Sequence, residues 1–202
     1  MFNERQKQKA TTASAVLEAA RAEFERVGFE AANLRAIAKR AGVSAGTVIH
    51  HYGDKRDLLH AALFEELDLA LQDALASVGD GPLEHQLSTL TKAVFKSYQR
   101  RPTLSRTLLK ESLFAEPPWA KKFAGQTAQV HGALTKLALD AVARDELKPE
   151  LDAPLFAMAW LSFFYFGLIA WAQGAHPRPV ALVEKLVAQH LAGLRREPRR
   201  SR

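Results

Sequence analysis

Small and hydrogen-bonding side chains that could meet a polyanion are gathered between residues 45 and 56. Residues 45–47, AGT, are small enough to let a partner approach the backbone closely. Residues 50–52, HHY, carry N–H and O–H groups that can donate hydrogen bonds to phosphate oxygens. Lys55 and Arg56 stand at the expected start of a long helix, where a cation and free backbone N–H groups can hold one phosphate together. These residue types predict contacts with the base edges and the backbone of DNA.

Two short helices joined by a glycine turn must position these groups. Asn33 and Ser44 are good N-caps, because each side chain can accept a hydrogen bond from a free N–H of the first helical turn. Gly42 follows the first helix, where a left-handed residue is needed and glycine adopts that conformation without strain. This is the layout of a helix-turn-helix, whose second helix lies in the major groove. The alternative is an ordinary helical hairpin in an all-α core.

A specific resemblance to the N-terminal domain of the TetR family of transcriptional regulators rests on the run from Phe24 to Leu59, F-x-x-x-G-F…IA…AGVS-x-GT-x-x-HHY-x-x-K-x-x-LL. It covers roughly residues 12–62. The resemblance implies that one set of residues faces the groove and a second set holds phosphates. The groove set is Arg35, Ala45, Thr47, His50 and His51, the phosphate set is Ser44, Tyr52 and Lys55, and Asn33 and Gly46 complete the expected DNA-binding residues.

Two positions depart from the family pattern. Ile49 stands where the family commonly has an aromatic residue that touches DNA, so this contact is lost or becomes an apolar one to a thymine methyl. Asn33 stands where the family often has threonine. The rest of the chain matches no family motif.

A length of 202 residues suits one large domain or two small ones. Because 48% of the residues are hydrophobic, the chain can form an ample apolar core. A net charge of +6 favours a polyanionic partner. Cysteine is absent, which excludes disulfides and thiolate metal sites and fits a reducing cytoplasm. The polar N-terminus lacks the apolar segment of a signal peptide. We therefore expect a cytoplasmic location.

The helical periodicity predicts an all-α fold of about nine helices with no strand. The first helix is expected over 12–27, after a frayed or disordered segment 1–11 whose Arg5, Lys7 and Lys9 could alternatively reach a minor groove. The remaining helices are expected near 34–41, 45–52, 54–78, 83–100, 102–114, 119–144, 153–173 and 179–194. We divide the chain into a DNA-binding domain at 1–53, a ligand-binding and dimerisation domain at 54–195, and a basic, disordered tail at 196–202.

The segment 155–172 contains no charged residue and just reaches the length of a membrane span. It has no basic cluster at either end, and small residues occur on several of its faces. A helix that is apolar all round can instead be buried on all sides. In a TetR-like architecture this helix would face a ligand cavity and a partner subunit. The alternative is a helical protein without a DNA role, associated with a membrane through this segment.

Aromatic residues of the second domain suit a small hydrophobic or aromatic ligand, which would release the DNA. The expected ligand-binding residues are Tyr98, Trp119, Phe123, His131, Trp160 and Phe164, although a histidine such as His131 is more often a hydrogen-bonded core residue. Two copies of helices 155–172 and 179–194 would form the interface of a homodimer on a pseudo-palindromic operator. Its expected residues are Phe163, Gly167, Ala170, Val183, Val187 and Leu191. No catalytic or metal-binding motif occurs, so we expect neither an enzyme nor a cofactor.

Overall fold

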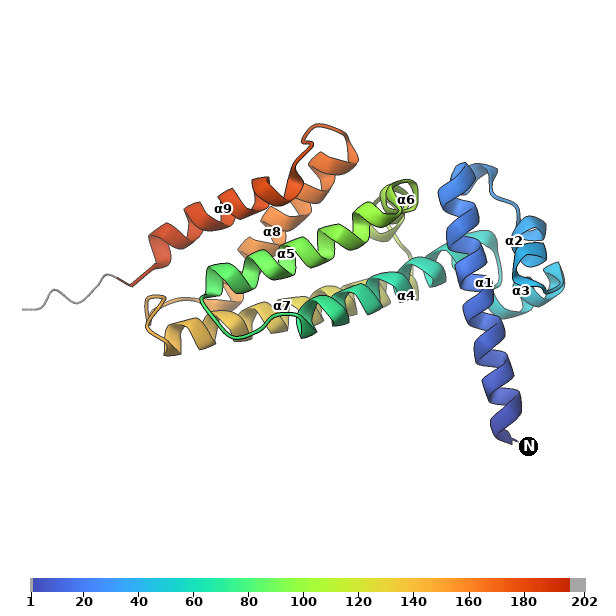
Figure 1. Cartoon of the computed structure of the whole chain (residues 1–202), viewed down its shortest axis with the longest axis horizontal. Coiled ribbons are helices and arrows are strands. Elements are labelled where there is room, and N and C mark those ends of the chain that lie inside the picture. Colours follow the sequence, from blue (N-terminus) through green and yellow to red (C-terminus); the bar gives the residue numbers. More distant parts are fainter. Residues whose placement is uncertain (1, 197–202) are drawn as a thin grey trace, which may run out of the picture. The chain divides into compact units, whose positions relative to one another are not determined.

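Nine α-helices make up the fold in the computed structural model, which describes residues 2–196 (Figure 1). They are α1 (Phe2–Ala31), α2 (Leu34–Ala41), α3 (Ala45–Tyr52), α4 (Lys55–Ala76), α5 (Leu83–Arg100), α6 (Pro102–Leu113), α7 (Trp119–Ala143), α8 (Ala153–Ala172) and α9 (Pro179–Leu194). Over this range the β-structure is limited to one isolated bridge between Leu147 and Arg195. The expected all-α class is therefore confirmed.

The first helix begins much earlier than predicted, at Phe2. Residues 6–11 are exposed and polar, but Gln, Lys and Ala are good helix formers, so the helix continues there without packing. Its regular part ends where expected, because Gly28 adopts φ 77° and ψ 169° and interrupts the helix before a last turn to Ala31. The expectation of a frayed segment 1–11 is wrong for residues 2–11.

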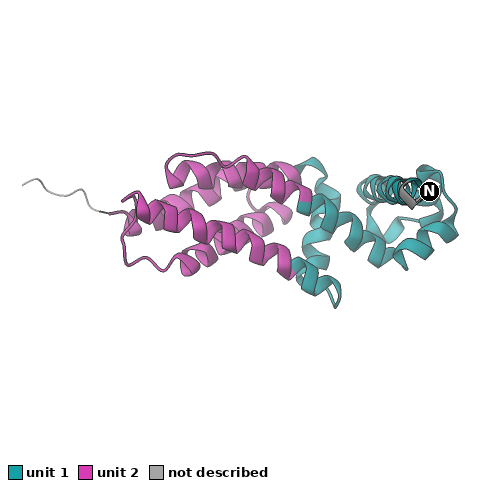
Figure 2. Ribbon diagram, turned by 90° about the horizontal axis from the view of Figure 1, so that it is seen from below, with its two compact units in different colours: residues 1–68, 98–123 teal, residues 69–97, 124–202 magenta. Residues whose placement is uncertain are grey.

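The chain divides into two compact units, residues 1–68 with 98–123 and residues 69–97 with 124–202 (Figure 2). We call them unit 1 and unit 2. Helices α4, α5 and α7 each contribute residues to both units. This division follows contacts within the chain, and the functional division at residues 53 and 195 stays a prediction.

Within unit 1, α1 packs against both α2 and α6. The core contains Val16 and Phe24 of α1, Ile37 of α2, Val48 of α3 and Leu58 of α4, all buried. The helix-turn-helix is thus joined to α4 and α6 through one hydrophobic core, which α1 crosses.

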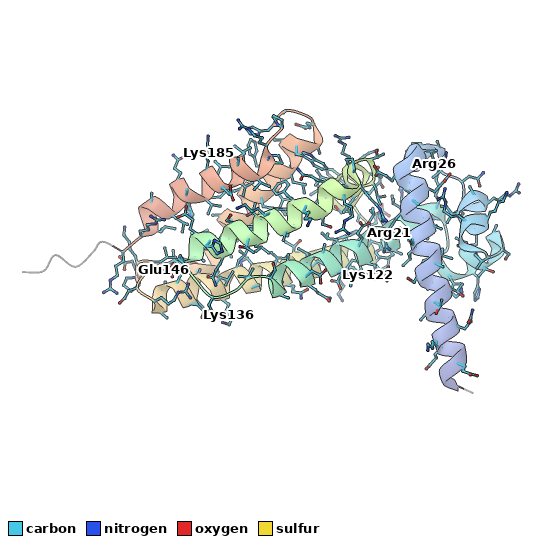
Figure 3. All side chains as sticks on the ribbon, in the orientation of Figure 1. Arg21, Arg26, Lys122, Lys136, Glu146 and Lys185 are labelled. Carbon is cyan, nitrogen blue, oxygen red and sulfur yellow. The ribbon has the colours of Figure 1, made fainter. Side chains whose placement is uncertain are left out.

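Charged side chains reinforce the same helices. The side chain of Arg21 is labelled on α1 in Figure 3. This buried residue donates from Nε to the Ala62 carbonyl at 3.0 Å, and its guanidinium lies 2.6 Å from Glu65. Glu25 of α1 accepts hydrogen bonds from the backbone N–H groups of Thr103 and Leu104, at 3.3 and 2.7 Å. A carboxylate at this position satisfies free N–H groups and the positive end of the helix dipole. Glu25 therefore caps α6 from α1.

In unit 2, α8 packs against α9 at very short range. A Cβ atom added at Gly167 would lie 2.5 Å from Cγ2 of Val183, so only glycine permits this approach. Among residues 2–196, α8 is the one helix long and apolar enough to cross a membrane by length and composition, and 39% of its most apolar window is buried inside the chain. A core helix of a soluble protein satisfies the same criterion.

The last described residues join unit 2 as well. The Arg196 N–H donates to the Glu146 carbonyl at 3.2 Å, while the Arg195 and Arg196 side chains pair with Glu84 and Asp145. Arg195 and Arg196 are thus not part of a free tail. The remainder of the predicted tail, 197–202, lies outside the described residues.

Candidate DNA-binding surface and effector region

The turn between α2 and α3 is closed by the predicted caps. Asn33 Oδ1 accepts from the Arg35 N–H at 2.8 Å, and Ser44 Oγ accepts from the Thr47 N–H at 3.0 Å. Gly42 has the left-handed φ of 70°, and its N–H is bonded to carbonyls at the end of α2. Local hydrogen bonding therefore fixes the helix-turn-helix geometry, as the sequence predicts.

One face of α2 and α3 is open to solvent. Arg35, Ser44, Gly46 and His50 are exposed, and Ala45, Thr47 and His51 are half-buried. Val48 points inward and is buried, which sets the orientation of α3. Gly46 and His50 thus lie on the side of α3 that faces away from the core, whereas Ala45 and His51 lie nearer to the buried Val48, and Arg35 is exposed on α2. Ile49, which was not among them, is also exposed, with 52% of its surface open.

Tyr52 and Lys55, two predicted phosphate ligands, have partners inside the protein. The Tyr52 hydroxyl donates to the Ala13 carbonyl at 3.1 Å, and burial raises the pKa of this phenol. Lys55 Nζ donates to the carbonyls of Glu30 and Ala32, at 3.0 and 3.3 Å, and lies 4.7 Å from the Phe29 ring centre. An ammonium group has three N–H donors, so one remains for a phosphate.

The predicted ligand residues fall into two groups. Trp119 and Phe123 belong to unit 1, as does the buried Tyr98. The ring centres of Trp119 and Phe123 lie 6.2 and 6.0 Å from that of Phe64 in α4. The Trp119 Nε1–H donates to Asp57 Oδ1 at 2.8 Å, and the Lys122 ammonium lies 3.9 Å from the Trp119 ring centre. The aromatic end of α7 is therefore attached to α4.

His60 is a member of this cluster that the sequence reasoning missed. It is buried, its ring lies 5.5 Å from Trp119 and 6.0 Å from Phe123, and neither ring nitrogen has a hydrogen-bond partner among the described residues. Burial lowers its pKa, although the Glu111 and Asp57 carboxylates oppose that effect. Its position within an otherwise apolar stripe of α4, one turn before Phe64, could have indicated from the sequence that His60 is buried.

The second group lies in unit 2. Trp160 and Phe164 stack at 5.3 Å between ring centres, and Phe164 also contacts Phe95 at 4.8 Å. The Trp160 Nε1–H is buried without a hydrogen-bond partner in the described chain. His131 Nε2 lies 3.1 Å from the Pro154 carbonyl oxygen and donates to it, which ties α7 to the start of α8. His131 is thus half-buried with a hydrogen-bond partner inside the chain, and its ligand role stays a prediction.

A cavity of about 440 Å³ opens in unit 2 between α5 and α9. Five of its eight lining residues have polar side chains, and none of the predicted ligand residues is among the eight. The lining residues are Pro82, Glu84, His85, Leu87, Ser88, Thr91, Glu184 and Val187. Within residues 2–196, no cluster of three or more His, Asp or Glu could hold a metal ion.

Most of the predicted dimer residues are buried inside the chain. Gly167, Ala170, Val183, Val187 and Leu191 are all less than a tenth exposed. Gly167 lies against Val183 between α8 and α9, and because all five residues are buried within the chain, a partner would cover almost no additional area on them. Apolar residues at helical spacing predict a buried face, and here other residues of the same chain cover that face.

Phe163 differs, since it is half-buried beside His190 at 5.6 Å between ring centres. The large apolar residues of α8 that remain exposed are Leu155, Met158, Phe166 and Ile169.

A family model, sequence relatives and solved structures all relate this chain to transcriptional regulators. The family model described as "Bacterial regulatory proteins, tetR family" matches residues 16–62. The HTH-type transcriptional repressor KstR of Mycolicibacterium smegmatis is 28% identical over 192 residues, which are 91% of this chain and 88% of that protein.

Two solved structures of similar fold carry acyl-CoA ligands. FadR from Bacillus subtilis in complex with stearoyl-CoA aligns with a TM-score of 0.74 at 17% identity, covering 90% of this chain and 98% of that one. Thermus thermophilus FadR in complex with lauroyl-CoA aligns with a TM-score of 0.69 at 19% identity, covering 94% and 99%. At these identities the structures share the fold.

Proposed function

The chain belongs to the TetR family of transcriptional regulators, and from this premise we propose that it is a dimeric repressor that releases its operator when a small hydrophobic or aromatic effector binds. The observation that carries the proposal is the open face of α3. Gly46 and His50 are exposed on this face, while Val48 anchors the other side of the helix in the core. A recognition helix in the major groove requires this arrangement.

DNA contacts are proposed at the residues expected from the sequence. Arg35, Thr47 and His50 would read base edges, and Ser44 with the free donor of Lys55 would hold phosphates. The test is selection of bound sequences from random DNA, followed by binding measurements over a range of salt concentrations. A selected half-site and a steep salt dependence support the proposal. Equal binding of all sequences, or none, contradicts it.

A homodimer is proposed because one recognition helix contacts too few base pairs for useful specificity. Leu155, Met158, Phe166 and Ile169 recur at spacings of three, eight and three residues, so they form one outward stripe on α8. This stripe, with Phe163 beside it, could bury the apolar area that a stable interface needs. Sedimentation equilibrium should give twice the chain mass at micromolar concentration.

The effector is proposed to be mainly apolar. Each unit has an aromatic group of its own, Trp119 with Phe123 in unit 1 and Trp160 with Phe164 in unit 2, and either could contact an apolar ligand. Tyr98 is the candidate polar contact in unit 1, and His131 is the one in unit 2. The stearoyl-CoA and lauroyl-CoA complexes of the FadR neighbours make acyl-CoA thioesters sensible first candidates, alongside small aromatic compounds. Each candidate would be tested by its ability to displace labelled operator.

The proposed switch acts through α4. Trp119 is hydrogen-bonded to Asp57, which lies two residues after Lys55 in the first turn of this helix. A ligand that displaces Trp119 would therefore move the helix whose beginning holds a phosphate. By linkage, operator must weaken effector binding by the same factor as effector weakens operator binding. Calorimetric titrations of effector with and without operator test this, because equal affinities would exclude the mechanism.

A membrane-associated protein without a DNA role is the second candidate, and the observation behind it is the apolar length of α8. Its exposed stripe could face lipid instead of a second subunit. Cell fractionation combined with the salt-dependent DNA assay separates the two. Recovery with the cytoplasm and specific DNA binding favour the repressor. TetR-family regulators are generally non-enzymatic DNA-binding proteins, so no reaction is proposed.

A further inference from the structure

Ile49 is an apolar residue in the middle of the surface that the proposed function turns toward DNA. Its neighbour Val48 is buried, whereas 52% of the Ile49 surface is open. Gly46 precedes it by three residues and His50 follows it, and both are exposed. In an α-helix, residues three and four apart share a face. Ile49 and His50 therefore both lie one turn after Gly46, side by side on the exposed part of α3.

Gly46 leaves the approach to Ile49 open. A Cβ atom at Gly46 would have only an ordinary contact, 3.6 Å from Ser44 Oγ, so the interior of the protein does not require glycine there. Its backbone does not adopt the left-handed conformation that favours glycine. The missing side chain instead leaves space on the outer face, one turn before Ile49, where the edge of a base pair can approach.

Resting on the proposed DNA-binding function, we infer that Ile49 reads the C5-methyl group of a thymine in each operator half-site. In the major groove, the thymine methyl is the apolar group that unmodified base pairs present. An alkyl side chain packs against it and removes both surfaces from water. At the other bases, Ile49 would cover a donor or an acceptor and offer no hydrogen bond in return, which is unfavourable. Ile49 thus favours thymine and disfavours the alternatives.

The role of Ile49 differs from that of a phosphate contact. An alkyl group cannot neutralise a phosphate, so its removal should leave the salt dependence of binding unchanged. Its effect should be confined to one base pair per half-site. These two properties distinguish direct reading of a methyl group from a general contribution to affinity.

The experiment removes the methyl group from the DNA. After the preferred site has been selected, each thymine is replaced in turn, in both half-sites, by deoxyuridine, which lacks only the C5-methyl. With the wild-type chain, one thymine position should show a loss of about fourfold in affinity per half-site. With Ile49→Ala, replacement at that position should have no effect, while the other thymine positions behave as in the wild type. Ile49→Val, which keeps a branched alkyl group, should retain the sensitivity.

Each other outcome overturns the inference. If Ile49→Ala shows the same deoxyuridine profile as the wild type, or if no thymine position is sensitive, Ile49 does not read a methyl group. If the wild-type chain selects no DNA sequence, the proposed function itself fails, and this is seen before any modified duplex is made. Because Ile49 is exposed, its truncation leaves no cavity, and circular dichroism of the variants verifies the fold.

Discussion

The indole Nε1–H of Trp119 donates to Asp57 Oδ1 at 2.8 Å, joining the first turn of α7 to the first turn of α4. The other carboxylate oxygen of Asp57 lies close to Gly53, where an added Cβ would be only 3.1 Å away. One carboxylate thus binds the aromatic cluster at the beginning of α7 and leaves little room for a side chain at Gly53, the residue that follows α3.

Trp119→Phe should weaken this connection while keeping an aromatic ring in the cluster. The loss of a hydrogen bond to a carboxylate should reduce the free energy of unfolding by about 1–2 kcal/mol. We also expect a smaller effect of effector on operator affinity, since α7 would no longer be bonded to α4. Urea denaturation and operator displacement measure the two effects. Trp171→Phe, in unit 2, is the control, and an equal loss in both variants would contradict a specific role for Trp119.

Gly46→Ala should separate stability from DNA binding. Alanine is favoured over glycine within a helix by roughly 0.5–1 kcal/mol, and the added Cβ meets only an ordinary contact at 3.6 Å. The melting temperature should therefore rise, while the new methyl group obstructs the groove and lowers operator affinity. Gly42→Ala is the matched comparison, because φ 70° there makes any side chain strained and the melting temperature should fall. Unchanged operator affinity of Gly46→Ala would place α3 differently on DNA.

Stability should decrease in mild acid because of His60. Burial lowers the pKa of this histidine below its ordinary 6.5, so the unfolded chain takes up a proton that the folded chain resists. The free energy of unfolding should be constant with respect to this group above about pH 6.5, should fall as the pH drops below that value, and should level off below the folded pKa. Urea titrations between pH 5 and 8 measure it. His60→Phe should flatten the dependence, and an unchanged slope would rule out His60 as its source.

Lys55→Met should have two separate effects. Loss of its bonds to the Glu30 and Ala32 carbonyls should reduce stability by about 1 kcal/mol, since methionine keeps most of the alkyl chain. If the third N–H holds a phosphate, the slope of log affinity against log salt should become shallower by about one. Lys55→Arg should retain the salt slope. A lowered stability with an unaltered slope would assign Lys55 to the fold alone.

Gly167→Ala should destabilise the packing of α8 on α9. The new Cβ would lie 2.5 Å from Val183 Cγ2, and overpacking of this kind costs about 1–3 kcal/mol. The double variant Gly167→Ala, Val183→Ala removes the colliding methyl and should recover part of the loss. A double-mutant cycle from thermal unfolding gives the coupling energy. Simple additivity would show that the two residues do not press on each other.

Features that depend on local chemistry could be predicted from the sequence. Helices α5 and α9 have the expected bounds, and Asn33, Ser44 and Asp152 cap their helices as expected, because a cap involves neighbouring residues only. The start of α1 could not be placed, since an exposed polar segment gives no periodic signal.

Partners distant in the sequence could not be predicted either. Tyr52 and Lys55 have donors suited to phosphates, but only the folded chain shows that Ala13 and Glu30 occupy them. Likewise, the apolar composition of α8 predicts that the helix is covered without saying whether α9 or a second subunit covers it. His60 escaped notice because one histidine within an apolar stripe has no distinctive spacing.

Glu25 limits how DNA specificities can be exchanged between relatives. A hybrid protein joined between residues 53 and 54 would take α1 from one parent and α6 from the other. Glu25 would then no longer face the N–H groups of its native Thr103 and Leu104. Arg21 would likewise lose Glu65 and the segment around Ala62. The segment to exchange is instead the whole of unit 1, residues 1–68 with 98–123. Because these are two separate stretches of the chain, a hybrid with a single crossover cannot contain both from one parent.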